Sequence, residues 1–162
     1  SGHPVADADR LCRIEEAAVR WRWKLRPLAR RARRTHGDFH PFNILFRDDV
    51  GGGNGDADFS VLDCSRRGAG EPADDVTCLA INYLFFALAR RGAFTGALRM
   101  LWAAFWERYL GASRDHELLE VVAPFFAWRT LVVASPVWYP DIADVVRERM
   151  LRFDPNTIEA LL

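Results

Sequence analysis

An acid, an amide and a second acid in the first half of the chain have the types and order that phosphoryl transfer requires. Asn43 follows Asp38 by five residues, and Asp63 follows Asn43 by twenty. A carboxylate such as Asp38 can orient an attacking hydroxyl and take its proton. The side-chain oxygens of Asn43 and Asp63 are of the kind that Mg²⁺ binds beside nucleotide phosphates. The pattern predicts Asp38 as the catalytic residue and Asn43 and Asp63 as the metal ligands.

Two short apolar stretches are expected to hold these side chains in place. Residues 36–43 are predicted to form a loop, and residues 44–47 and 59–62 to form two strands, joined by a glycine-rich hairpin tip over 48–58. An antiparallel pairing that sets Ile44 opposite Leu62 also sets Asn43 opposite Asp63, about 5 Å away. The metal site would then form from local structure alone.

The rest of the chain has the apolar spacing of helices. Apolar residues recur every three to four positions between Asp7 and Arg34, which predicts a helix that Pro27 kinks or ends. Downstream of the strands we expect five more helices, at about 74–91, 94–111, 115–134, 140–153 and 155–162. The predicted fold class is therefore mainly α with a small β-hairpin (α+β).

Composition limits the class of protein without naming a partner. The chain has 162 residues, 50% of them hydrophobic, with 22 basic and 22 acidic side chains. This length suits a single domain over residues 1–162. No apolar run approaches the ~20 residues that cross a bilayer, and no signal peptide is recognisable, so we expect no membrane partner and a cytoplasmic location. Three widely spaced cysteines suggest neither a disulfide framework nor a zinc ribbon.

Two longer motifs surround the three polar residues. His36 to Asn43 has the form H-G-D-x-x-x-x-N, and Leu62 to Val76 has an apolar residue and Asp, then Gly-Glu-Pro, then Asp-Val. The pair resembles the aminoglycoside phosphotransferase and choline kinase family, a branch of the protein-kinase-like fold, with Glu71 in place of a common Asp. The resemblance implies the same roles for Asp38, Asn43 and Asp63. It also implies Mg²⁺ as cofactor and ATP or GTP as phosphoryl donor.

Two further residues are expected to brace the catalytic loop. Asp75 is similar to the family's buried acid that opens the next helix and supports the loop. His36 is expected to hydrogen-bond backbone atoms and to fix the loop.

Kinases that the chain resembles carry an N-terminal β-rich lobe with a glycine-rich loop and a lysine over the phosphates. Only about 35 residues precede the catalytic loop here, and they have a helical pattern. We therefore expect the C-terminal lobe alone. Residues 35–76 would form the catalytic loop, hairpin and metal-binding segment, and residues 77–162 a helical substrate-side subdomain. The missing N-terminal lobe would be its partner, and the isolated chain would bind ATP weakly and transfer phosphate poorly.

The sequence does not identify the acceptor of the phosphoryl group. A small-molecule kinase of this kind phosphorylates a hydroxyl, and aminoglycosides, choline-like amines, sugars and amino-alcohols all fit. Fold and catalytic loop set the chemistry and not the substrate.

Two other functions remain open. One is a non-catalytic binding or regulatory module, which the absence of an upstream glycine-rich lobe in the parent protein would favour. The other is a metal-dependent hydrolase that uses His36, Asp38 and His40. On an extended loop, however, residues two apart point the same way while a third ligand is still required, and histidine-metal sites usually need three ligands.

A dense basic run precedes the catalytic loop. Nucleic-acid binding through it is not favoured, because nothing else in the chain resembles a nucleic-acid-binding fold. The simpler interpretation is a solvated helix face, which could contact the missing lobe or an anionic ligand. The run comprises Arg20, Arg22, Lys24, Arg26, Arg30, Arg31, Arg33 and Arg34.

Overall fold

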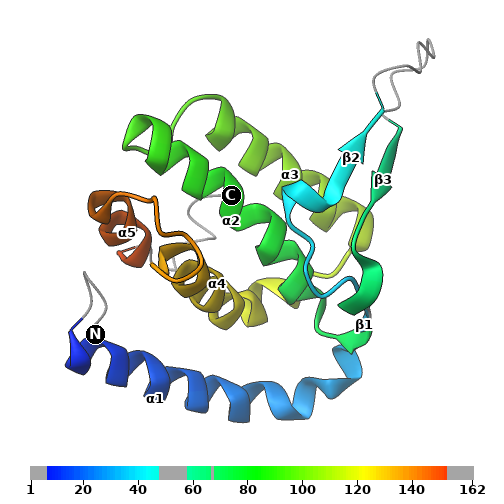
Figure 1. Cartoon of the computed structure of the whole chain (residues 1–162). Coiled ribbons are helices and arrows are strands. Elements are labelled where there is room, and N and C mark those ends of the chain that lie inside the picture. Colours follow the sequence, from blue (N-terminus) through cyan, green and yellow to red (C-terminus); the bar gives the residue numbers. More distant parts are fainter. Residues whose placement is uncertain (1–6, 48–57, 67, 153–162) are drawn as a thin grey trace.

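The computed structural model describes residues 7–47, 58–66 and 68–152. Four helices, α2 to α5, pack together, while α1 runs along one side of them and a β-hairpin projects from the opposite corner (Figure 1). The described residues confirm the predicted fold class, mainly α with small β elements. None of the helices described is long and apolar enough to cross a membrane.

The core is built around α2 (Pro72–Arg91), which has apolar side chains on nearly every face. It packs against α3 (Ala97–Ser113), α4 (Leu118–Ala134) and α5 (Asp144–Leu151). The predicted starts of these helices differ from the observed ones by two to four residues, and a further predicted helix, 155–162, lies outside the described residues. In the core, Trp102 and Trp106 of α3 lie against Phe126 of α4, with ring centroids 5.6 and 6.2 Å apart. Such aromatic pairs add packing energy beyond the area they bury.

The first helix differs from α2 because it buries none of its residues. This helix, α1, spans Ala8–Leu25. A short 3-10 helix with Pro27 in its first turn, η1 (Arg26–Arg31), follows it. The prediction that Pro27 ends the helix is confirmed. The prediction that helix continues to Arg34 is wrong, because the chain turns there into strand β1.

Strand β1 (Arg33–Thr35) pairs antiparallel with β4 (Gly68–Gly70), a small sheet that the sequence did not predict. Glycine permits the close approach of the two strands, since a Cβ atom on Gly70 would lie 2.8 Å from Thr35 Oγ1. Three-residue strands carry too little apolar alternation to be recognised from sequence.

The hairpin of β2 (Ile44–Phe46) and β3 (Phe59–Val61) forms where expected, but its predicted register is wrong by one residue. Ile44 pairs with Val61, so Asn43 lies opposite Leu62 rather than Asp63. The side chains of this hairpin are largely exposed, and without a buried face nothing in the apolar pattern fixes the register. The predicted hairpin tip falls mostly on residues 48–57, outside the described residues.

Candidate active site

The catalytic loop is held by the first turn of α2. Asp75 Oδ2 accepts a hydrogen bond from the backbone N–H of His36 at 2.6 Å, and Oδ1 accepts one from Gly37 N–H at 2.9 Å. Gly37 has φ of +85°, and a Cβ atom there would lie 2.9 Å from the carbonyl oxygen of Arg66. Gly37 therefore allows the loop to turn where it contacts both Asp75 and the segment that follows β3, because a larger residue would be strained and would clash there.

His36 joins the two halves of the site. Its Nε2 lies 2.7 Å from the Leu62 carbonyl oxygen, and its Nδ1 accepts from the Asp38 N–H at 3.3 Å. Only the tautomer with hydrogen on Nε2 satisfies both contacts. Neither ring nitrogen is left for a metal, and within the described ranges no three His, Cys, Asp or Glu side chains gather to hold one. The structure thus gives the hydrolase hypothesis no support.

Both carboxylate oxygens of Asp38 have neighbours. Arg66 Nη1 lies 3.0 Å from Oδ2, and the Cys78 thiol lies 4.0 Å from Oδ1. Burial, chiefly, raises the pKa of Cys78 to about 12, so the thiol stays protonated and acts as a weak donor. Arg66 is mostly exposed, and a pair of this kind contributes little, about 0–1 kcal/mol. The arginine can therefore leave Asp38 at low cost.

Asn43 and Asp63 lie on segments that are bonded together. The Asn43 side-chain amide donates from Nδ2 to the Asp38 backbone carbonyl oxygen at 3.0 Å, and the Asn43 backbone carbonyl oxygen accepts from Leu62 N–H at 2.8 Å. Asp63 follows directly, with φ of +50°, a left-handed conformation that aspartate tolerates better than most residues. Its Oδ1 accepts from Ser65 Oγ at 2.7 Å. Within the described part of the chain, Asn43 Oδ1 and Asp63 Oδ2 accept no hydrogen bond.

These contacts hold together the segments that carry the predicted site residues. They differ from the cross-strand pairing that was predicted from the sequence. The expected cross-strand pairing of Asn43 with Asp63 is absent. Instead, the His36 ring, the Asn43 amide and the Asp75 carboxylate tie the loop to the end of β3 and to α2. The individual roles of Asp38, Asn43, Asp63, His36 and Asp75 stay predictions.

A family model described as the phosphotransferase enzyme family matches residues 2–130. The chain belongs to this family. The matched range includes the catalytic loop, the hairpin and α2, which confirms the resemblance drawn from the two motifs. Nothing among the curated proteins or the solved structures matches the chain.

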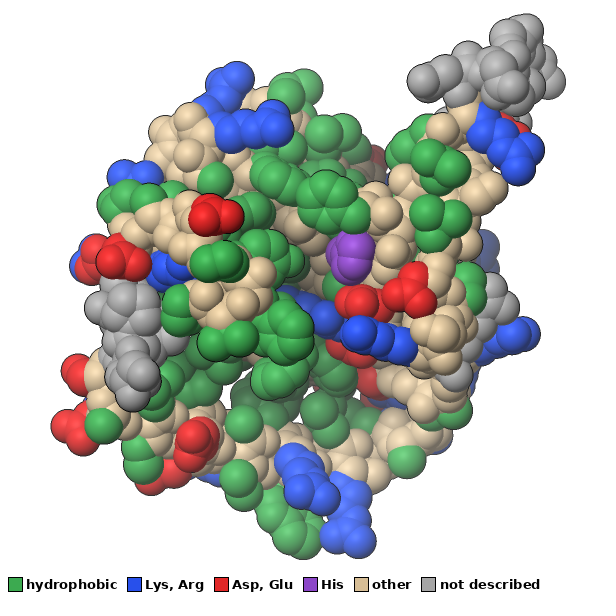
Figure 2. Space-filling view, in the orientation of Figure 1, with side chains coloured by type: hydrophobic (Ala, Val, Ile, Leu, Met, Phe, Trp, Pro, Cys, Tyr) green, Lys and Arg blue, Asp and Glu red, His purple; other side chains and the backbone are tan. Residues whose placement is uncertain are grey.

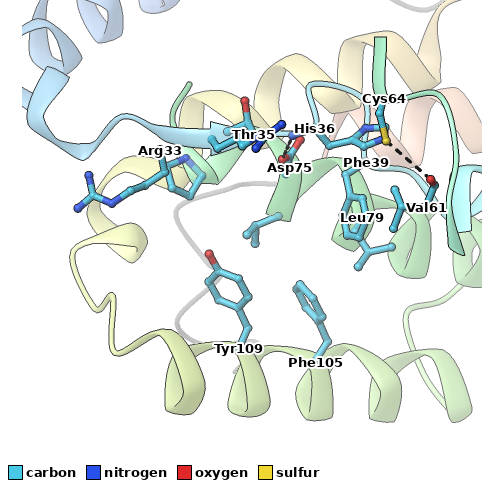
Figure 3. Close-up of a pocket in the computed structure, with 13 residues that line it drawn as sticks. Arg33, Thr35, His36, Phe39, Val61, Cys64, Asp75, Leu79, Phe105 and Tyr109 are labelled. Carbon is cyan, nitrogen blue, oxygen red and sulfur yellow. Dashed lines mark hydrogen bonds between the residues drawn. The ribbon is translucent and has the colours of Figure 1, made fainter. Parts of the chain in front are cut away.

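In this phosphotransferase-family chain a cavity of about 690 Å³ lies behind the catalytic loop (Figure 3). Phe105 and Tyr109 of α3 point up into it, toward Phe39 of the loop and Leu79 of α2. Burial raises the pKa of Tyr109. Asp38, Asn43 and Asp63 do not line this cavity, so it is distinct from the site predicted for those side chains.

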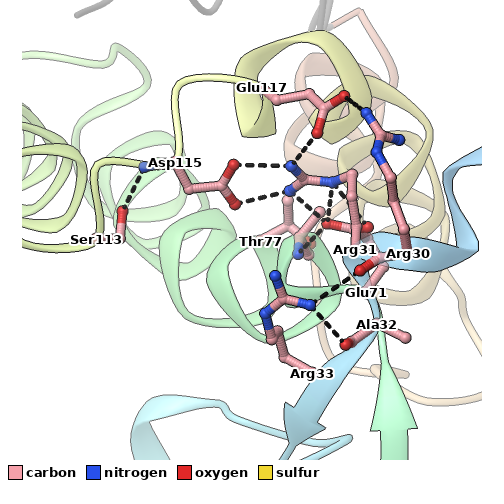
Figure 4. A network of polar contacts seen from close by, with 10 residues as sticks. Arg30, Arg31, Ala32, Arg33, Glu71, Thr77, Ser113, Asp115 and Glu117 are labelled. Carbon is pink, nitrogen blue, oxygen red and sulfur yellow. Dashed lines mark hydrogen bonds and ion pairs between the residues drawn. The ribbon is translucent and has the colours of Figure 1, made fainter.

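An ion-pair network joins η1 to the start of α2 and to the segment before α4 (Figure 4). Arg31 is 6% exposed and binds three acids: Glu71, the N-cap of α2, at 2.8 Å, and Asp115 and Glu117, before α4, at 2.7 and 2.9 Å. The hydrogen bond from Arg31 is the first cause that lowers the pKa of Asp115 and of Glu117. The solvated-face interpretation of the basic run is wrong for Arg31.

Sequence reasoning also missed Arg66 and Cys78 as neighbours of Asp38. Cys78 had a usable signal, since it lies three residues after Asp75 and so on the same helix face. Arg66 had only its position, three residues after Asp63, in a segment whose turn could not be foreseen.

Proposed function

We propose that this chain forms the catalytic end of a small-molecule kinase, which transfers the γ-phosphoryl group of ATP or GTP to an acceptor hydroxyl. The observation that supports it most is the joining of Asp38, Asn43 and Asp63 through His36 and backbone hydrogen bonds. Family membership supports phosphotransferase chemistry at the coarse level.

Asp38 is proposed to orient the acceptor hydroxyl and to accept its proton. The hydroxyl oxygen forms the new bond to the γ-phosphorus, and the bond from that phosphorus to the β–γ bridging oxygen breaks. Its electron pair leaves with the nucleoside diphosphate. Arg66 must move off Asp38 Oδ2 for the acceptor to reach this oxygen. The Cys78 thiol lies 4.0 Å from the other oxygen and is at most a weak donor to it.

The donor set fits Mg²⁺. Asn43 Oδ1 and Asp63 Oδ2 are oxygen atoms without hydrogen-bond partners in the described residues, and Mg²⁺ takes one or two protein oxygens together with substrate phosphates. When bound, the ion would neutralise charge on the phosphates. Ser65 Oγ holds the other Asp63 oxygen and so orients the carboxylate.

The hairpin presents an apolar surface beside this site. Leu45, Phe46, Phe59 and Leu62 are between 44% and 59% exposed. An exposed patch of this kind indicates a binding surface. We infer that it contacts the nucleotide base and the second lobe of the kinase, and that residues 35–76 and 77–162 divide the catalytic and the substrate side.

The test is a phosphate-transfer assay with the full-length protein, labelled ATP or GTP, Mg²⁺ and a panel of alcohols. Asp38→Asn and Asp63→Asn are expected to lower turnover at least about a hundredfold, because each removes a group used in the transition state. Asp58→Asn is the matched control and should keep wild-type turnover, because Asp58 is an exposed acid that pairs with Arg47 beside the tip of the same hairpin, away from the site. Turnover within tenfold of wild type in both site variants would refute the assignment.

A further inference from the structure

A second, larger cavity lies between α1 and α4. It has a volume of about 1100 Å³ and is called here the α1–α4 hollow. Figure 2 shows a hollow lined by hydrophobic side chains on the same face as a histidine and a group of acids. Its principal lining residues are Val19, Trp21, Arg22, Trp23, Arg26 and Trp128.

The tryptophans make this surface unusual for a region open to solvent. Trp23 is 63% exposed and Trp128 is 57% exposed, and they lie on different helices, α1 and α4. Tryptophan rings from both helices thus line one cavity, together with the half-buried Phe125 of α4. Flat apolar walls of this kind suit a ligand with a flat apolar body.

The first turns of α2 lead from the hollow to the catalytic loop. Asp74 lines the hollow, and its Oδ1 lies 2.6 Å from Arg129 Nη2. Cys78 lies one turn after Asp74 on the same face of α2, and its Sγ lies 4.0 Å from Asp38 Oδ1. A molecule seated in the hollow that extends along this face of α2, past the Asp74–Arg129 ion pair, would approach Asp38.

The charges in the hollow disfavour a polycation. Asp74 is the only acid among the described residues that line the hollow, and it already pairs with Arg129. Arg22 and Arg26 also line it, and within the described residues neither forms an ion pair with an acid. The Arg26 guanidinium lies 5.2 Å from the Trp23 ring centroid. An anionic group would meet two arginines, whereas an ammonium group would find no unpaired carboxylate there.

We propose that the α1–α4 hollow binds the acceptor of the reaction, and that this acceptor is an alcohol with an aromatic body and an anionic group. This assignment rests on the proposed kinase function. The aromatic body would lie between the tryptophans of α1 and α4, the anion would face Arg22 and Arg26, and the hydroxyl would reach toward Asp38. Polycationic aminoglycosides are not the substrate class that this cavity fits.

The test is isothermal titration of the chain with three probes of the same shape that differ in charge. The probes are 6-(hydroxymethyl)-2-naphthoate, 2-naphthalenemethanol and 6-(hydroxymethyl)-2-naphthylmethylammonium, with kanamycin as the polycation. The naphthoate is expected to bind at least about tenfold more tightly than the ammonium probe, and kanamycin least tightly. Equal affinities for the naphthalene probes, or preferred binding of kanamycin, would overturn the proposal.

Variants locate the binding. Trp128→Ala should weaken naphthoate binding at least about tenfold, while Trp138→Ala, a 72% exposed tryptophan outside the hollow, should leave it unchanged. Trp23→Ala provides a second lining variant, and the circular dichroism spectrum shows whether each variant folds. Unchanged naphthoate binding in folded Trp128→Ala and Trp23→Ala would refute the site.

A charge variant tests the anionic group separately. The double change Arg22→Gln and Arg26→Gln should abolish the preference for naphthoate over the neutral alcohol. Arg13→Gln with Arg20→Gln, on the same helix but outside the hollow, should preserve it. A preference that survives the first pair would contradict the role of these arginines.

Full-length protein separates this proposal from the kinase function. If the naphthoate binds but no alcohol is phosphorylated from ATP or GTP, the kinase proposal fails and the acceptor assignment fails with it, leaving an aromatic-anion binding site. If kanamycin is phosphorylated and the naphthoate neither binds nor reacts, the kinase proposal stands and the acceptor assignment is wrong.

Discussion

Two helices of nearly equal length, α1 and α2, serve this chain in opposite ways. The 20 residues of α2 include ten that are buried, and the first turn of α2 holds the catalytic loop through Asp75. The 18 residues of α1 include none that are buried. Apolar content alone does not decide this, because α1 also carries Trp21, Trp23 and several aliphatic side chains. The difference shows that one helix builds the core and the other closes a cavity.

Polar anchors near its two ends keep α1 in position. Near its start, Arg10 Nη2 donates to the Leu151 carbonyl oxygen of α5 at 2.7 Å. Beyond its end, Arg31 of η1 joins the three acids of the network. The second half of α1, from Ala18 onward, lines the α1–α4 hollow between these anchors. Such a helix can present apolar side chains to a ligand because the core does not use them.

The strongest way to break this arrangement is to remove the anchor at Arg31. Arg31→Met leaves Glu71 and Asp115 without their cation and Glu117 with Arg30 alone. It should lower the free energy of unfolding by about 3 kcal/mol, the lower end of the range for a buried pair, because the acids are partly exposed. Urea unfolding followed by circular dichroism measures this. Arg34→Met, an exposed change three residues on, should stay within about 0.5 kcal/mol of wild type. Equal stability of the two variants would show that the network is not an anchor.

A matched pair of apolar truncations compares the helices directly. Ile81→Ala on α2, where the side chain is 2% exposed, should cost about 2–5 kcal/mol because it leaves a cavity in the core. Val19→Ala on α1, where the side chain is 57% exposed, should change stability by less than about 0.5 kcal/mol. Thermal or urea unfolding distinguishes them, and similar losses at both positions would contradict the division of roles.

Acid should loosen the anchor before the core. The pKa of Asp115 is lowered in the folded chain, first by the hydrogen bond from Arg31, so its contribution is present above the unfolded pKa of about 4. That contribution is lost as the pH falls through the folded pKa. Asp115→Asn should therefore be less stable at pH 7 and lose less stability below about pH 4. Parallel acid limbs for wild type and variant in urea titrations would disprove this linkage.

The sequence predicted those parts of the fold that follow from local pattern. The apolar spacing of α2 to α4, the break at Pro27 and the two hairpin strands were recognisable because each depends on residues close in the chain. The loop at residues 36–43 was recognisable because its residue types and spacing match a motif of the family to which the chain belongs. The neighbours of Asp38 and the burial of Arg31 were not, since Arg31 meets Glu71 and Asp115 across 40 and 84 residues.

The hairpin register shows that a local pattern does not fix how Asn43 and Asp63 are placed relative to each other. Local pairing was expected to bring Asn43 next to Asp63, but Leu62 takes that position and Asp63 turns away from the strand at φ of +50°. Only the tertiary contacts of His36 and Asp75 reveal how the loop and the end of β3 meet.

Metal binding in the full-length protein tests the central claim most directly, because it separates the proposed ligands from the proposed base. Mn²⁺ can replace Mg²⁺ as an oxygen-bound ion, and electron paramagnetic resonance reports the fraction bound in the presence of ATP. We predict that Asp63→Ala weakens Mn²⁺ binding at least about tenfold, whereas Asp38→Ala binds Mn²⁺ like wild type yet transfers no phosphate. Wild-type Mn²⁺ affinity in Asp63→Ala would contradict the account.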